Sequence, residues 1–355
     1  MEPLNFDIRF CRTHDGVRIA SSANGSGPHL VRTGTWLGHV ELETREPDSL
    51  ARLRWLGDRF TFLRYDSRGC GLSDRQVDEV TFDGLLADLE AVMDSRSIER
   101  ATLLGVSAGA ALAIAYAAKH PERVERLVLM NGFFRGYFSA PNLDPALRAE
   151  ADLLLKNAEV GWDNPRSIFR HVFLAQMLGT AGPQEQRVFE ERMRQSMDGA
   201  MAAKHLRCDF AIDVKAQCAR VTQPTLVFHC RGDEMVSFQQ GRNLAALIPG
   251  ARFIPLEYGG HHLLWSDPAA RVFERELEAF MPGGGTVATA PQLTARQREV
   301  LRAVAQGKTD KQIARDMELS PRTVEMHVAG AMRALECATR AAAVSRAGAS
   351  GLLEP

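Results

Sequence analysis

Apolar runs of strand length alternate with amphipathic segments over roughly the first 280 residues, and this alternation restricts the fold more than any other feature. The amphipathic segments near 81–97, 108–120 and 268–280 are typical of helices. The strand-like runs are PHLVRTGTW, RFTFLRYD, RATLLGVS, ERLVLMNG, QPTLVFHCRGD and ARFIPLEYGG. Because parallel strands are joined by crossovers that usually contain a helix, the pattern predicts an α/β fold with a mostly parallel sheet.

The alternation stops between about 134 and 219, where the sequence is helical, amphipathic and richer in charge and Met. We expect this segment to be a helical insertion between two strands of the sheet. Ligands in such sheets bind at the carboxyl ends of the strands, so an insertion at that edge would form a lid over the pocket.

A glycine-rich segment, MPGGGTVATAPQ, begins at Met281 and divides the chain. It contains three glycines, two prolines and no charged residue, which is typical of a linker. A chain of 355 residues is also long for a single core. We therefore expect one domain over 1–281, a linker over 282–292 and a small all-α domain over 293–355.

The composition is globular, with 45% apolar residues, 25% charged residues and a net charge of −1. The cysteines show no CxxC pair and no metal-ligand spacing, so we expect buried thiols in a reducing compartment, no metal and no other cofactor. No segment is typical of a signal peptide or approaches the roughly 18 apolar residues of a membrane span, so we expect a cytoplasmic protein without a membrane partner. The cysteines are Cys11, Cys70, Cys208, Cys218, Cys230 and Cys337.

Ser107 lies in the sequence GVSAG, where a strand-like run ends and an alanine-rich segment begins. A strand-to-helix elbow strains the serine backbone, and small neighbours let the two chain segments pass closely. Gly105, Ala108 and Gly109 meet that requirement. The pattern is short enough to arise by chance, so an ordinary tight turn is the alternative interpretation.

Several separated stretches of the first domain resemble the α/β-hydrolase family. They are YDSRGCGLSD, the KHPERV that closes the helix after Ser107, HCRGDEMV and YGGHHLLWSDP. The resemblance implies an α/β-hydrolase fold in which Ser107 is the nucleophile, His261 is the general base and Asp233 orients the imidazole. It favours His261 over His262 because His261 lies seven residues before Pro268.

Asp233 and His261 also have plainer explanations. An aspartate after a strand usually forms a turn, and a histidine pair after two glycines can belong to a solvated loop. The triad is therefore a hypothesis that depends on geometry.

The oxyanion hole is where this chain departs from the family. The backbone N–H of Ala108 is one expected donor, and the N–H of Trp36 is the other. The family has His-Gly after an early strand, whereas this chain has Gly34-Thr35, and threonine adopts a positive φ less readily than glycine. Loss of one donor lowers the rate by about two to three orders of magnitude, so we expect slow turnover if there is any.

The sequence from Leu293 onward has unusually complete helix signals. Thr294 with Gln297, and Thr309 with Gln312, form two capping boxes. Gly307 is a helix C-terminal signal, and the Ser-Pro pair at 320–321 is an N-cap followed by proline. Short helices joined by short turns predict a helix-turn-helix.

This module closely resembles the LuxR-type DNA-binding domain over its whole length. The alternative is a degenerate helical module used for protein contacts. The matching residues are Leu293, Thr294, Arg298, Glu299, Val300, Leu301, Gly307, Lys311, Gln312, Ile313, Ala314, Leu319, Ser320, Thr323, Val324, His327, Met332 and Leu335.

The helix after Ser320 has an apolar face, which we expect to pack inward, and an opposite face that would enter the major groove of DNA. Basic side chains on this face and before it would contact phosphates, Met326 would touch a thymine methyl, and Glu325 would accept from cytosine. Because Ala329 offers no hydrogen bond, we expect few contacts to bases and a low affinity of each module. A homodimer that binds two half-sites would compensate for this low affinity. The expected DNA-contacting residues are Lys308, Lys311, Arg322, Thr323, Glu325, Met326 and Arg333.

Two functions follow from these resemblances. The first is a transcriptional regulator that binds promoter DNA through the C-terminal module and senses a small apolar molecule, which it could hydrolyse. The stretches TWLGHVELETREP and YDSRGCGLSDR favour it, because they resemble hydrolase-like domains that bacteria fuse to regulatory modules. The alternative is an esterase- or lactonase-like serine hydrolase with a secondary DNA-binding tail.

Overall fold

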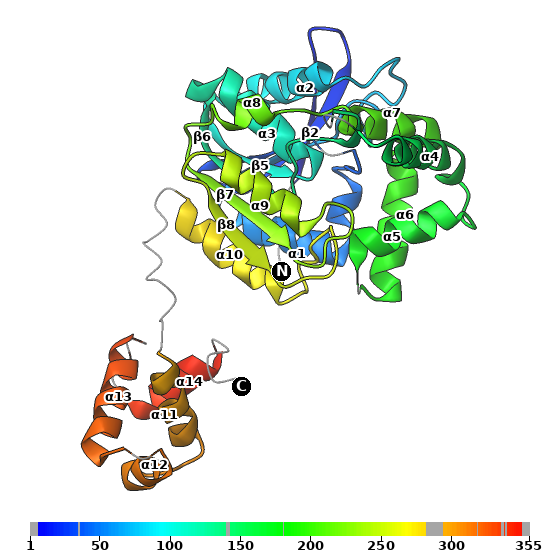
Figure 1. Cartoon of the computed structure of the whole chain (residues 1–355). Coiled ribbons are helices and arrows are strands. Elements are labelled where there is room, and N and C mark those ends of the chain that lie inside the picture. Colours follow the sequence, from blue (N-terminus) through cyan, green and yellow to red (C-terminus); the bar gives the residue numbers. More distant parts are fainter. Residues whose placement is uncertain are drawn as a thin grey trace. The chain divides into compact units, whose positions relative to one another are not determined.

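The chain forms two compact units, Met1–Pro282 and Gly283–Pro355 (Figure 1). The expected linker at 282–292 lies outside the part of the chain that the structure describes. This computed structural model describes residues 6–34, 36–139, 143–179, 181–281, 294–317, 319–334, 337 and 339–349.

An eight-stranded sheet lies at the centre of the first unit, in the order β1-β2-β4-β3-β5-β6-β7-β8. The pairs β1–β2 and β2–β4 are antiparallel and all other pairs are parallel, which confirms the expected mostly parallel α/β sheet. The hairpin of β1 and β2 was not expected from the sequence. The strands are β1 (Asp7–Arg12), β2 (Arg18–Asn24), β3 (His29–Arg32), β4 (Thr61–Tyr65), β5 (Ala101–Val106), β6 (Val124–Met130), β7 (Thr225–Cys230) and β8 (Arg252–Leu256).

Helices cover both faces of this sheet (Figure 1). Side chains of α1 and α10 belong to the core on one face, and side chains of α2, α3, α8 and α9 belong to the core on the other. Alternate residues of the central strands serve the two cores: Leu103 lies in one and Leu104 in the other. The covering helices are α1 (Pro47–Gly57), α2 (Phe82–Ser95), α3 (Ala108–Lys119), α8 (Lys215–Cys218), α9 (Phe238–Leu247) and α10 (Ala269–Phe280).

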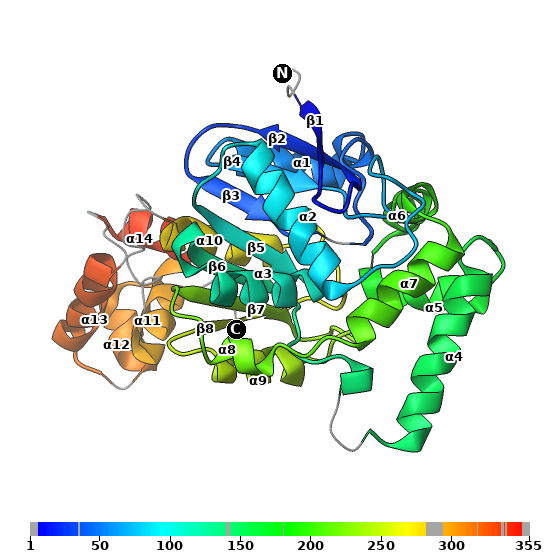
Figure 2. The same ribbon diagram turned by 90° about the horizontal axis from the view of Figure 1, so that it is seen from above.

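A helical insertion separates β6 from β7 and gathers at one end of the sheet (Figure 2). It has an aromatic and methionine core of its own, in which Trp162 is fully buried, and it packs on Leu85 and Leu112 of the sheet unit. Its last helix, α8, returns to the sheet and buries Cys218 against it. The other helices are α4 (Pro145–Gly161), α5 (Ile168–Leu178), α6 (Pro183–Ser196) and α7 (Gly199–Phe210), preceded by the short turn η3 (Tyr137–Ser139).

The second unit is a four-helix bundle in its described part. Val324, Val328 and Ala331 of α13 are buried, as expected for its inward face, whereas Leu335 lies outside the described residues. Its apolar contacts come from α11, α12 and α14. The helices are α11 (Ala295–Ala305), α12 (Asp310–Asp316), α13 (Pro321–Ala334) and α14 (Arg340–Ala349).

The capping signals of this unit have direct structural counterparts. The Thr294 N–H donates to the Gln297 side chain at 2.9 Å, and the Gln297 N–H donates to the Thr294 hydroxyl at 3.2 Å. The Thr309 N–H donates to the Gln312 side chain at 2.8 Å. Gly307 has a φ of +78°, which favours glycine. The turns of this domain are therefore set by local sequence. Among the described helices of the whole chain, none is long and apolar enough to cross a membrane.

Candidate functional site

Ser107 occupies a strained turn between β5 and α3, with φ 55° and ψ −127°. Its N–H donates to the Met130 carbonyl at 2.9 Å, which fixes the turn to the next strand. A Cβ at Gly105 would lie 2.6 Å from the Cα of Ala110, and a Cβ at Gly109 would lie 2.6 Å from the Thr33 hydroxyl. Only glycine fits at these two crossings, so the small residues around Ser107 are needed to hold the strained backbone.

Asp233 and His261 meet at the same edge of the sheet, because they follow β7 and β8. The Nδ1 of His261 lies 2.7 Å from Oδ2 of Asp233. The other carboxylate oxygen accepts the backbone N–H groups of Met235 and Val236, each at 2.9 Å. The carboxylate is fully buried and held from both sides, so it fixes the imidazole in the tautomer with a proton on Nδ1.

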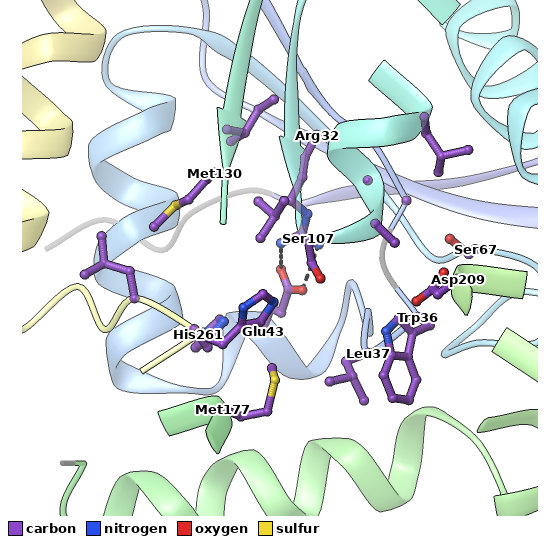
Figure 3. A pocket seen from close by; sticks show the side chains of 18 of the residues that line it. Arg32, Trp36, Leu37, Glu43, Ser67, Ser107, Met130, Met177, Asp209 and His261 are labelled. Atoms are coloured by element: carbon purple, nitrogen blue, oxygen red, sulfur yellow. Dashed lines mark hydrogen bonds and ion pairs between the residues drawn. The ribbon is translucent and has the colours of Figure 1, made fainter. Parts of the chain in front are cut away.

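The Nε2 of His261 is buried and has no hydrogen-bond partner among the described residues. Ser107 and His261 line the same pocket (Figure 3), but the hydrogen bond between them is not formed in the structure. A free Nε2 lone pair in a pocket that also contains a serine is compatible with a general base. Hydrogen bonds of this kind often form only when a substrate is bound.

Asn131 holds the loop that carries His261, a role that no motif in the sequence indicates. Its Nδ2 donates to the His261 carbonyl at 2.5 Å, and its Oδ1 accepts the Cys230 N–H at 2.8 Å. Asn131 is buried and has a φ of 49°, a conformation that asparagine tolerates better than most residues. One side chain therefore joins the ends of β6 and β7 to the histidine.

The expected oxyanion donors lie in the pocket wall. Ala108 begins α3, where a helical N–H has no acceptor within its own helix. Trp36 also lines the pocket, and its ring packs on Trp162 and Phe173 of the insertion, with centroids 5.5 and 5.7 Å away. Thr35, the residue that departs from the family, lies outside the described part of the chain.

The expected DNA-contacting residues cluster around α12 and α13. Arg322, Glu325 and Met326 are exposed on α13, and Met326 has 59% of its surface accessible, which is high for an apolar side chain. Thr323 is half-buried, with its N–H bonded to the Ser320 hydroxyl at 3.1 Å.

Three further residues of that set differ in what surrounds them. Lys311 is exposed on α12. Lys308 is exposed too and pairs with Asp316 at 2.8 Å. Arg333 belongs to α13, and its side chain lies outside what the structure describes.

The model of the alpha/beta hydrolase fold family matches residues 28–268, more than half of the chain. The chain belongs to this family. The model of the bacterial regulatory proteins of the luxR family matches residues 291–347, so the second unit is a luxR-type DNA-binding domain. Both resemblances inferred from the sequence are thereby confirmed.

Relatives of this alpha/beta hydrolase cover its first domain. The putative carbamate hydrolase RutD of Pseudomonas syringae is 26% identical over 266 residues, which are 74% of this chain and 92% of that protein. The AB hydrolase superfamily protein YisY of Bacillus subtilis is 25% identical over 269 residues, 73% of this chain and 94% of that one. A hydrolase structure from Pseudomonas aeruginosa aligns with a TM-score of 0.64 and 26% identity, covering 77% of this chain and 98% of that chain.

The pocket of the hydrolase domain has a volume of about 130 Å³ and is lined mainly by apolar side chains. Charged residues also line it, and no sequence motif marks them. Arg32 and Glu43 form an ion pair of 2.8 Å within the pocket wall (Figure 3). Arg32 ends β3, whose last three residues are buried, and a charge at the end of an apolar run is the one signal that could have revealed it.

Asp209 is a further polar group of the pocket that was not expected from the sequence. It closes the amphipathic helix α7, where its charge resembles an ordinary solvated position, yet it is 8% exposed. Its carboxyl group has no hydrogen-bond partner among the described residues. Burial raises the pKa of Asp209 from 3.8 to about 8, so the group is mainly protonated at neutral pH.

We predict that Asp209→Asn stabilises the protein more at pH 9 than at pH 5. The folded-state pKa lies above the unfolded-state value, so stability that depends on Asp209 is complete below about pH 4 and is lost as the pH rises through about 8. Asparagine stays neutral and avoids this loss. Melting temperatures of both proteins across this pH range measure the effect. The exposed loop residue Asp78 supplies the control Asp78→Asn, and an equal pH dependence of the two variants would contradict the prediction.

Proposed function

We propose that the chain is a transcriptional regulator whose hydrolase domain binds a small molecule and whose luxR-type domain binds promoter DNA. The observation that supports this most directly is the presence, in one chain, of a DNA-binding domain and a largely apolar pocket that contains Ser107 and His261. A ligand would act by favouring one arrangement or association of the chain over another, because only differential affinity can shift such an equilibrium.

Ser107, His261 and Asp233 are proposed as a nucleophile, its base and the group that orients the base. In this reaction the serine oxygen attacks a carbonyl carbon while its proton passes to Nε2 of His261, and the leaving group then takes that proton. Water then attacks the acyl-serine while its proton passes to Nε2 of His261. The serine oxygen leaves and takes that proton, which releases the acid. The Ala108 and Trp36 N–H groups are the proposed oxyanion donors. The segment around Thr35 supports slow turnover, which suits a domain that senses its ligand.

The exposed face of α13 is proposed to read DNA in the major groove. Arg322, Lys311 and Lys308 would contact phosphates, and so would Arg333. Thr323, Glu325 and Met326 would approach base edges. The thioether of Met326 is exposed on this face and is therefore accessible to a base edge. A homodimer on two half-sites would supply the affinity that one sparse reading helix lacks.

A serine hydrolase is the second candidate function, and one observation favours it. The 2.7 Å contact between His261 and Asp233, held by two further backbone N–H groups, is the geometry that a catalytic histidine requires. The name of the relative RutD, putative carbamate hydrolase, also supports hydrolysis of an acyl group.

We predict that Asp233→Asn lowers the hydrolysis of p-nitrophenyl esters by the full-length chain by about 10⁴-fold, because the imidazole loses its fixed tautomer. Ser107→Ala removes both this activity and labelling by a fluorophosphonate. The adjacent exposed Glu234→Gln serves as the control and retains both. Unchanged hydrolysis in Asp233→Asn would rule out the proposed triad.

We predict that Arg322→Gln weakens DNA binding similarly across sequences and makes the slope of log affinity against log salt shallower by about one contact, or 0.9. The measurement uses the full-length chain and a DNA fragment that it selects from a random-sequence pool. Arg148→Gln, an exposed change on α4 of the hydrolase domain, removes the same charge as a control. A slope near zero for the wild-type chain would contradict DNA binding through phosphates.

The sensing function is tested by the same DNA fragment in the presence of a panel of acids, amides, esters and lactones. We expect at least one compound to change the DNA affinity of both the wild-type chain and Ser107→Ala, because binding and not chemistry is the signal. A response confined to the wild-type chain would show that acyl transfer is part of the switch. If no compound in the panel changes the affinity, the regulator proposal fails in favour of the hydrolase.

A further inference from the structure

Four charged side chains line one part of the hydrolase pocket. Arg32 comes from β3, Arg52 from α1, Arg192 from α6 of the insertion, and Glu43 from the short turn η1 (Leu42–Thr44). The side chains of Arg32, Glu43 and Arg192 are only 10%, 3% and 5% exposed. Charges buried to this extent require partners, so their pairing can be followed group by group.

Two glutamates form ion pairs with three of the arginines in this region. Glu43 pairs with Arg32 at 2.8 Å and lies 3.5 Å from Arg64, which is completely buried. Glu46 pairs with Arg192 at 2.6 Å. The arginines around Glu43 lower its pKa far below the usual range, although burial opposes this. Each of the two glutamates is therefore already paired with an arginine.

Two further acids lie near this group but bind backbone N–H groups. Asp66 accepts the N–H of Val40 at 2.8 Å and that of Leu72 at 2.9 Å. Asp48 accepts the N–H groups that follow Leu264, at 2.9 and 2.8 Å. Neither acid forms an ion pair with an arginine among the described residues.

Arg52 has no acid partner within hydrogen-bond distance in the described part of the chain. One of its nitrogens lies 3.4 Å from the Ser49 hydroxyl, and a nitrogen of Arg192 lies 3.4 Å from the same oxygen. The guanidinium groups of Arg52 and Arg192 therefore share the neutral hydroxyl of Ser49 as a hydrogen-bond acceptor. Burial lowers the pKa of Arg52, Glu43 raises it, and Arg32 and Arg192 lower it further. The Nε atoms of Arg32 and Arg192 are buried, and no described residue accepts a hydrogen bond from them.

We propose that Arg52 and Arg192 bind the carboxylate of the small molecule that occupies this pocket, an inference that rests on the proposed sensing function. A carboxylate supplies the negative charge that the site lacks, and its two oxygens match the planar fork of a guanidinium. Apolar side chains of the same pocket, Leu56, Phe62 and Trp265, receive the rest of the molecule. The ligand is thus an amphipathic acid, which changes the expectation of an apolar one.

The two arginines belong to different parts of the domain. Arg52 lies on α1, which packs on the sheet, whereas Arg192 lies on α6 of the insertion. A carboxylate that is bound by both arginines connects the insertion to the sheet unit. This connection adds to the contact that Arg192 makes with Glu46. Binding of the acid therefore stabilises the packing of the insertion on the sheet unit, which is a change that a sensor can transmit.

The test compares matched acids and neutral amides on full-length Ser107→Ala, which cannot turn the compounds over. The probes are octanoate with octanamide, and 4-phenylbutyrate with 4-phenylbutyramide, each followed by calorimetry and by the shift in melting temperature. We expect at least one acid to bind tenfold or more tightly than its amide. Amides that bind as tightly as their acids, or a panel in which no acid binds, would overturn the proposal.

The variant Arg52→Gln tests whether the preference for acids over amides depends on the proposed carboxylate site. We expect this change to abolish the difference between acid and amide and to leave the melting temperature of the empty protein unchanged or higher, because no buried partner loses its ion pair. The control Arg45→Gln removes an arginine that is 67% exposed and should retain the preference. Retained preference in Arg52→Gln, or an empty protein that melts several degrees lower, would refute the assignment. Acid binding that leaves DNA affinity unchanged would overturn the sensing function but not the carboxylate site.

Discussion

The strained backbone of Ser107 is the constraint on which the arrangement of the hydrolase domain depends. A serine at φ 55° costs about 1–3 kcal/mol and persists only where its surroundings enforce it. Here β5 and α3 cross so closely that glycine is required at 105 and 109, and the turn is bonded to the end of β6. This strain turns the serine toward the pocket, where the ends of β7 and β8 also bring Asp233 and His261.

The sequence was most informative where structure is set locally. The six parallel strands, the elbow and the capping boxes of the second domain follow from periodicity and from residues a few positions apart. The hairpin of β1 and β2 was missed because neither strand is a continuous apolar run; β1 in particular is partly exposed. Such edge strands owe their form to pairing with the sheet, which a local pattern does not contain.

The polar groups of the site were harder to foresee for the same reason. Asn131, Arg52 and Arg192 act through contacts with residues distant in the sequence, and each is compatible with an ordinary surface position when read alone. Asp209 illustrates the physical cause: the same carboxyl group would be solvated on an exposed helix, whereas burial in the pocket keeps it protonated at neutral pH. The chemistry of these four residues depends on their tertiary contacts, which local sequence patterns do not contain.

The central claim of the proposed function is that binding of an acid in the pocket and binding of DNA to the luxR-type domain are energetically coupled. Coupling is reciprocal, so a ligand that changes DNA affinity must have its own affinity changed by DNA by the same factor. The decisive measurement is the affinity of full-length Ser107→Ala for its tightest acid, with and without saturating DNA. The account predicts a change of about 5- to 150-fold, equal to the change that the acid causes in DNA affinity. An affinity for the acid that is the same with and without DNA would contradict it.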